Sequence, residues 1–186
     1  MRLTGAMLLL ATSLALQAAE VSGVFVEDEY AMRDSRKLTL NGAGVREKFW
    51  IDIYVGSLYL SQPSTDVAAI LSNPGAWRIQ LDFIYKEVAS EKLLEAWREG
   101  FEGNQETEIL DALSSRIEQF YAYFTDSAVA GDQFAFDYLP GQGVETSKNG
   151  ESLGVIVGDD FARALMEIWL GNKPADKALK RGMLGQ

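Results

Sequence analysis

The chain has neither cysteine nor histidine among its 186 residues. Without cysteine it can form no disulfide bond, thiol nucleophile, zinc finger or iron–sulfur centre. Without histidine, the Ser–His–Asp arrangement and every imidazole-ligated metal site are excluded. Any chemistry must therefore use carboxylates, Lys, Arg, Tyr, Ser, Thr or backbone groups.

Basic residues are also scarce, with 17 Lys and Arg against 27 Asp and Glu and a net charge of −10. Nucleic-acid binding depends on clustered basic charge, so we expect no nucleic-acid partner. Gly141-Gln142-Gly143 lacks the third glycine of a dinucleotide loop, and no glycine-rich turn leads into a phosphate-binding lysine. The acidic runs at 27–29 and 159–160 lack the alternating oxygen ligands of a calcium loop. We therefore expect no bound cofactor or metal.

The N-terminus has the pattern of a secretory signal peptide. A basic Arg2 precedes an apolar run over residues 6–16, and the small residues Ala18-Ala19 follow. The run is shorter than the roughly 20 residues that cross a bilayer, so we expect no membrane-spanning segment. The sequence predicts a signal peptide at 1–19, one domain at 20–186, and a mature protein in the periplasm or secreted.

Strands are predicted where apolar and polar residues alternate. Asn149-Gly150 is a strong hairpin signal, and Asn41-Gly42 is read as the turn that ends an earlier strand. The predicted strands cover residues 24–26, 38–40, 49–55, 77–85, 134–138, 144–148 and 151–157.

Helices are predicted between and after these strands. Ser90 is the expected N-cap of the second helix, and Gly171 is the expected end of the fourth. The predicted helices begin near Ser64 or Thr65, at Ser90, near Leu110, at Asp159 and at Pro174. The predicted order of elements is several strands, then helices, then a hairpin and final helices. This order indicates an α+β fold, with helices packed on an antiparallel sheet.

One stretch suggests a binding site. Arg46 follows a glycine turn and, at the strand period of two, would share a face with Trp50 and Tyr54. An arginine, a large aromatic and a phenol in line could hold a carboxylate or phenolate and flank an apolar tail. The alternative is a surface arginine paired with Glu47 or another acid.

A series of motifs follows in order along most of the chain: 41–46, 53–60, Ala96-Trp97, Gly100-Phe101, Asn104, Asp137-Tyr138, Pro140-Gly141, 165–171, Pro174 and Leu179-Lys180. In these motifs the chain resembles the chalcone isomerase superfamily, and most closely its exported bacterial chalcone isomerase-like members. Their plant relatives include fatty-acid-binding proteins and true isomerases. The resemblance implies an open-faced β-sandwich, in which helices cover a large antiparallel sheet and a ligand cleft lies between them.

The resemblance also implies where a ligand would bind. Arg46 matches the arginine that assists the reacting group in true isomerases. The other polar positions of that site are replaced here, because they fall on Tyr54, Ala89, Ala96, Ile168 and Trp169. Electrostatic catalysis needs several donors, and losing one typically costs about 10² in rate.

The substitutions favour a non-catalytic protein that binds a fatty acid or similar apolar acid. Arg46 and Tyr54 would hold the carboxylate, and Ala89, Ala96, Ile168 and Trp169 would form part of the apolar wall. Two alternatives remain open at this point. One is an isomerase (intramolecular lyase) acting on an enone or phenolic substrate. The other is a cell-envelope interaction domain whose cleft is vestigial.

Overall fold

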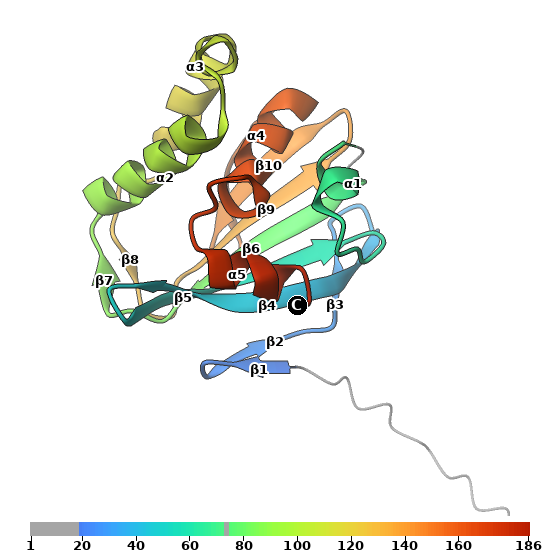
Figure 1. Ribbon diagram of the computed structural model, residues 1–186, viewed down its shortest axis with the longest axis vertical. Coiled ribbons are helices and arrows are strands. Elements are labelled where there is room, and N and C mark those ends of the chain that lie inside the picture. The colour runs from blue at the N-terminus through green and yellow to red at the C-terminus, as the bar shows by residue number, and fades with distance from the viewer. Residues whose placement is uncertain (1–18, 73–74) are drawn as a thin grey trace, which may run out of the picture.

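The structure, a computed structural model, describes residues 19–72 and 75–186 (Figure 1). The predicted signal peptide lies almost wholly outside this range. The helices are α1 (Val67–Ser72), α2 (Ser90–Asn104), α3 (Thr107–Tyr121), α4 (Asp159–Leu170) and α5 (Lys177–Met183). The strands are β1 (Ala19–Val21), β2 (Val24–Val26), β3 (Glu29–Ala31), β4 (Lys37–Lys48), β5 (Ile51–Leu60), β6 (Trp77–Phe83), β7 (Glu87–Val88), β8 (Ala128–Val129), β9 (Gln133–Leu139), β10 (Gly143–Lys148) and β11 (Glu151–Ile156).

A seven-stranded antiparallel sheet is the centre of the fold. Its strand order is β11-β10-β9-β6-β5-β4-β3, while β1-β2 and β7-β8 form small separate pairs. The hairpin predicted at Asn149-Gly150 is confirmed between β10 and β11, with φ angles of 52° and 80° at the two turn residues. These positive angles explain the Asn-Gly pair, because asparagine and glycine tolerate this region best. The α+β expectation is therefore correct.

The predicted turn at Asn41-Gly42 is wrong. Strand β4 continues through these residues to Lys48, with register irregularities between Leu40 and Gly42 and between Arg46 and Glu47. The chain turns instead at Phe49-Trp50, so residues 49–55 are a turn and the start of β5 rather than one strand. Neither aromatic residue is a turn signal, which is why the sequence pattern did not place the turn there.

The two faces of the sheet are covered differently. Figure 1 shows α2, α3, α4 and α5 on one side and the β1-β2 hairpin on the other. The helix-covered face holds the main core, which includes the fully buried Trp77, Phe136 and Trp169. A smaller apolar cluster on the opposite face joins residues of the N-terminal strands, such as Val26, to the sheet. This is the open-faced sandwich architecture expected from the resemblance.

Helix α5 lies unusually close to β4. A Cβ atom added to Gly44 would lie 3.2 Å from the Cα of Leu179, and one added to Gly182 would lie 2.8 Å from the Cα of Gly44. Glycine at both positions therefore lets backbone contact backbone. This contact fixes the C-terminal helix over the strand that carries Arg46.

The helix ends differ slightly from the predictions. Helix α2 begins at Ser90 itself, the preceding Ala89 occupies the N-cap position, and no side-chain cap forms. Helix α5 begins at Lys177, where Asp176 caps it by accepting a hydrogen bond from the backbone of Leu179. Gly171 ends α4 as predicted. In the part of the chain that the structure describes, no helix is long and apolar enough to cross a membrane.

Candidate functional site

Arg46 and Tyr54 face each other on neighbouring strands. They are direct partners in the β4-β5 register, so both side chains lie on the helix-covered face. The guanidinium carbon of Arg46 is 5.6 Å from the centre of the Tyr54 ring. The sequence spacing also predicted that Arg46 and Tyr54 share a face, but it placed both of them on one strand together with Trp50. The hairpin turn instead leaves Trp50 at the tip, 89% exposed, away from the pair.

Arg46 is half-buried and lacks a charged partner. Its Nε atom is buried without a hydrogen-bond acceptor, and within residues 19–72 and 75–186 it makes no ion pair. The pairing with Glu47 considered from the sequence is therefore not formed. A guanidinium presents five donors in a planar fork that matches a carboxylate. Because no ion pair occupies it, this guanidinium is a candidate anion-binding group.

Tyr54 connects this arginine to the core. Its hydroxyl oxygen accepts a hydrogen bond of 3.0 Å from the indole nitrogen of Trp169 on α4. Burial raises the pKa of Tyr54, while the positive charge of Arg46 opposes the rise and Asp176 adds to it. The phenol therefore keeps its proton at neutral pH. Among the described residues that proton has no side-chain acceptor.

Aromatic rings fill the space behind the pair. Tyr54 lies 5.3 Å from Phe83 between ring centres, and Trp169 lies 5.6 Å from Phe136. Trp97 on α2 completes the cluster, 5.7 Å from Trp169. Such edge-to-face and tilted contacts are the preferred aromatic geometries. The interior next to Arg46 is thus packed with side chains. Whether Tyr54 and Trp169 fill this space could not be decided from the sequence, and the structure shows that they do.

The remaining predicted site residues lie on or just before helices α2 and α4. Ile168 is buried on α4 and packs against α2, where a Cβ at Gly100 would lie 2.7 Å from its Cγ2. Ala96 is half-buried on α2, and Ala89 is exposed just before that helix. The structure thus brings Arg46, Tyr54 and Trp169 into contact.

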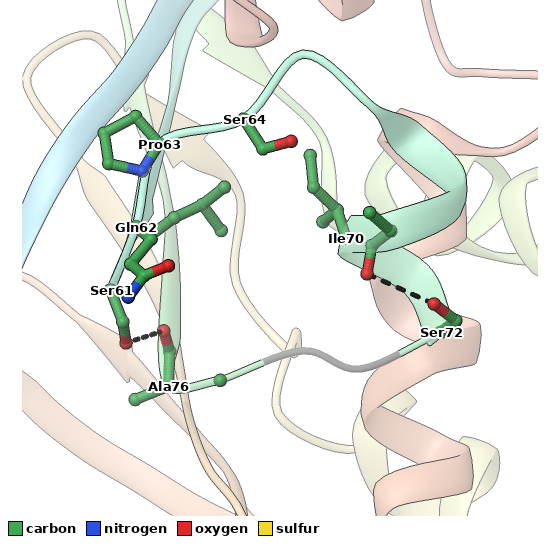
Figure 2. Close-up of a pocket in the computed structure, with 10 residues that line it drawn as sticks. Ser61, Gln62, Pro63, Ser64, Ile70, Ser72 and Ala76 are labelled. Atoms are coloured by element: carbon green, nitrogen blue, oxygen red, sulfur yellow. Dashed lines mark hydrogen bonds between the residues drawn. The ribbon is translucent and has the colours of Figure 1, made fainter.

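An open pocket at the far end of β5 was not predicted from the sequence (Figure 2). It has a volume of about 640 Å³, and Leu60 is six residues along the strand from Tyr54, about 20 Å away. The hydroxyl of Ser61 donates to the carbonyl of Ala76 at 3.0 Å, which joins its two sides. The sequence signal that could have located this pocket is the polar loop between a strand and a short helix. The lining residues, none of them charged, are Leu60, Ser61, Gln62, Pro63, Ser64, Ala69, Ile70, Ser72, Gly75 and Ala76.

The fold and an arginine on the helix-covered face of its sheet define a class of protein: an open-faced sandwich with a candidate anion site. The chain belongs to the chalcone isomerase-like family, whose model matches residues 18–185. Among solved structures it is similar to a fatty-acid binding protein from Arabidopsis thaliana, with a TM-score of 0.61 over 84% of this chain and 95% of that one. At 14% identity this similarity shows the shared fold. Comparison with curated protein sequences gives no significant match.

Proposed function

We propose that this protein binds a fatty acid or a similar apolar acid without converting it, and holds the carboxylate between Arg46 and Tyr54. The observation that carries the proposal is the half-buried Arg46, whose Nε atom is buried and has no partner among the described residues. Leaving such a donor unsatisfied is unfavourable, so a site of this kind is expected to have an anionic ligand. The predicted signal peptide supports a protein that acts outside the cytoplasm, in the periplasm or secreted.

The chemistry of the pair suits a carboxylate head group. Arg46 can donate two parallel N–H bonds to the two oxygens, and the protonated Tyr54 can add a third bond. Family resemblance supports an apolar acid as the ligand class, because one protein of this fold is a fatty-acid binding protein. Ring closure by an isomerase needs several donors aimed at developing charge. The side chains of Ala89 and Ala96 offer none.

One observation favours a second candidate, an interaction domain of the cell envelope with a vestigial cleft. The rings of Tyr54 and Trp169 are 3% and 0% exposed and hydrogen-bonded to each other, so an acyl tail can enter beside them only if they move. Protein interiors resist such rearrangement because they are close-packed. Lipid binding therefore separates the two candidates.

The test is a titration of the delipidated protein with palmitate and with its methyl ester. Arg46→Ala should weaken binding of the acid by about tenfold or more, the size of one charge-assisted hydrogen bond, and leave the ester unchanged. Arg98→Ala is the matched control, because Arg98 lies 5.7 Å from the ring centre of Tyr121 on the surface of α2 and α3. Equal losses for acid and ester would contradict the head-group role, and absence of any binding would favour the interaction domain.

A further inference from the structure

The tip of the β4-β5 hairpin is made of bulky apolar residues that lie exposed among the residues the structure describes. Phe49 is 79% exposed, Trp50 89% and Ile51 43%. Phe49 and Trp50 have φ angles of 53° and 62°, as a two-residue turn with both central residues left-handed requires. Asparagine and glycine adopt this conformation at much lower cost than aromatic residues. The tip thus combines backbone strain with exposed apolar surface, and neither benefits the isolated fold.

Other exposed apolar residues lie at the same end of the molecule. The backbone N–H of Tyr85 bonds to the carbonyl of Ile53 beside the hairpin, and Val129 pairs with Glu87 in the neighbouring β7-β8 ribbon. Tyr85 is 38% exposed and Val129 43%. Figure 1 shows the hairpin, β7 and β8 together at one end of the sheet, the end at which Arg46 lies on β4. We define this surface, Phe49, Trp50, Ile51, Tyr85 and Val129, as the apolar tip.

We propose that the apolar tip inserts into the interfacial layer of a lipid bilayer, with Trp50 at its leading point. A second copy of the chain is a poor occupant because the five side chains of the tip, weighted by their exposed fractions at no more than about 250 Å² each, offer at most about 730 Å², whereas a stable interface needs about 800 Å² from each partner. A bilayer needs no complementary surface, and tryptophan and tyrosine favour its headgroup region. A protein that takes up an amphiphile at Arg46 would then meet its ligand where amphiphiles are stored.

The charges around the apolar tip indicate which lipid headgroups the bilayer should have. Arg46 and Lys48 are balanced by Glu47 and Asp52 around the turn, and the whole chain carries −10. No positive field therefore draws the tip to anionic lipid, and the negative chain is repelled by it. We expect attachment to zwitterionic phosphatidylcholine that weakens when phosphatidylglycerol is added. Two aromatic side chains give weak, reversible attachment, as even a single acyl chain does.

The experiment is co-sedimentation of the full chain with phosphatidylcholine vesicles in the absence of fatty acid, so its outcome is independent of the proposed ligand. The double variant Phe49→Asn/Trp50→Gly places the preferred residues in the turn and should reduce the bound fraction about tenfold or more. Ile109→Ala is the control, because it removes a 45% exposed side chain from α3 and should bind as the wild type does.

A second measurement needs no variant. Trp50 is the one exposed tryptophan, since the other three are at most 4% exposed, so bromine-labelled lipid chains should quench its emission in the wild type. Sedimentation and quenching that both depend on the tip support the proposal. It is overturned if the wild type does not sediment with vesicles, if the double variant sediments equally, or if the tip instead mediates self-association.

Discussion

Replacing Arg46 by methionine separates a ligand-binding arginine from a structural one. Methionine keeps the apolar stem and removes the guanidinium. The buried, unpartnered Nε costs about 1–3 kcal/mol in the folded state, and the half-exposed contact with the Tyr54 ring returns about 0.5–1 kcal/mol. We therefore expect Arg46→Met to leave the free energy of unfolding unchanged or raise it by up to about 2 kcal/mol. Each kcal/mol corresponds to about 2–4 °C in Tm for a chain of this size.

Arg78 provides a matched substitution with the opposite expected sign. It is 5% exposed, donates to Asp137 at 2.8 Å and to Gln80 at 3.1 Å, and lies 3.8 Å from the ring centre of Tyr30. Breaking a buried pair by removing one partner costs about 3–5 kcal/mol. Arg78→Met should therefore be strongly destabilising, although the amino-acid change is the same.

The assay is urea unfolding of delipidated protein, followed by circular dichroism, for the wild type and both variants. Removing bound lipid is essential, because a ligand that binds only the folded state would stabilise the wild type by mass action. A loss of more than about 1 kcal/mol in Arg46→Met would refute the reasoning, since it would show that Arg46 stabilises the fold rather than waiting for a ligand.

Three further predictions concern packing and pH. Gly182→Ala should destabilise the protein by about 1–3 kcal/mol in urea unfolding, because the new Cβ meets the Cα of Gly44 at 2.8 Å; an unchanged midpoint would contradict the close contact. Thr146→Val should stabilise by about 1 kcal/mol in the same assay, because the buried hydroxyl has no partner, and any loss would show that it has one. Hydrogen bonds from Arg116 lower the pKa of the Asp160 carboxyl in the folded protein. The stability that this pair contributes to the fold is therefore complete above about pH 4, and it is lost as the pH falls through the lowered pKa. Asp160→Asn should therefore show a shallower loss of stability between about pH 4 and pH 2, and an unchanged slope would count against this pair.

Local patterns were sufficient for most of the fold. Alternating residues located β6 and β9, and Asn149-Gly150 located a turn, because each signal depends on neighbours in sequence. The β4-β5 turn was missed for a physical reason: Phe49 and Trp50 occupy left-handed positions that favour other residues. Such local conflicts between sequence and structure often mark functional features, which agrees with the proposed role of the apolar tip.

The candidate site was only partly predictable. Resemblance and spacing singled out Arg46 and Tyr54, but their contact comes from hairpin register rather than from one strand. The hydrogen bond from Trp169 joins residues 115 positions apart, and no local pattern carries that information. Nor could a local pattern show that Arg46 has no acidic partner among the described residues, because an ion pair depends on which side chains the fold brings close together.

The carboxyl signal of bound ¹³C-labelled palmitate tests the central claim most directly. A carboxylate beside Arg46 should titrate below its ordinary pKa, because the guanidinium favours the charged form. Arg46→Met should raise that pKa, while Arg98→Ala leaves it in place. A bound carboxyl group whose titration is the same in all three proteins, or a wild type that shows no bound signal, would contradict the account.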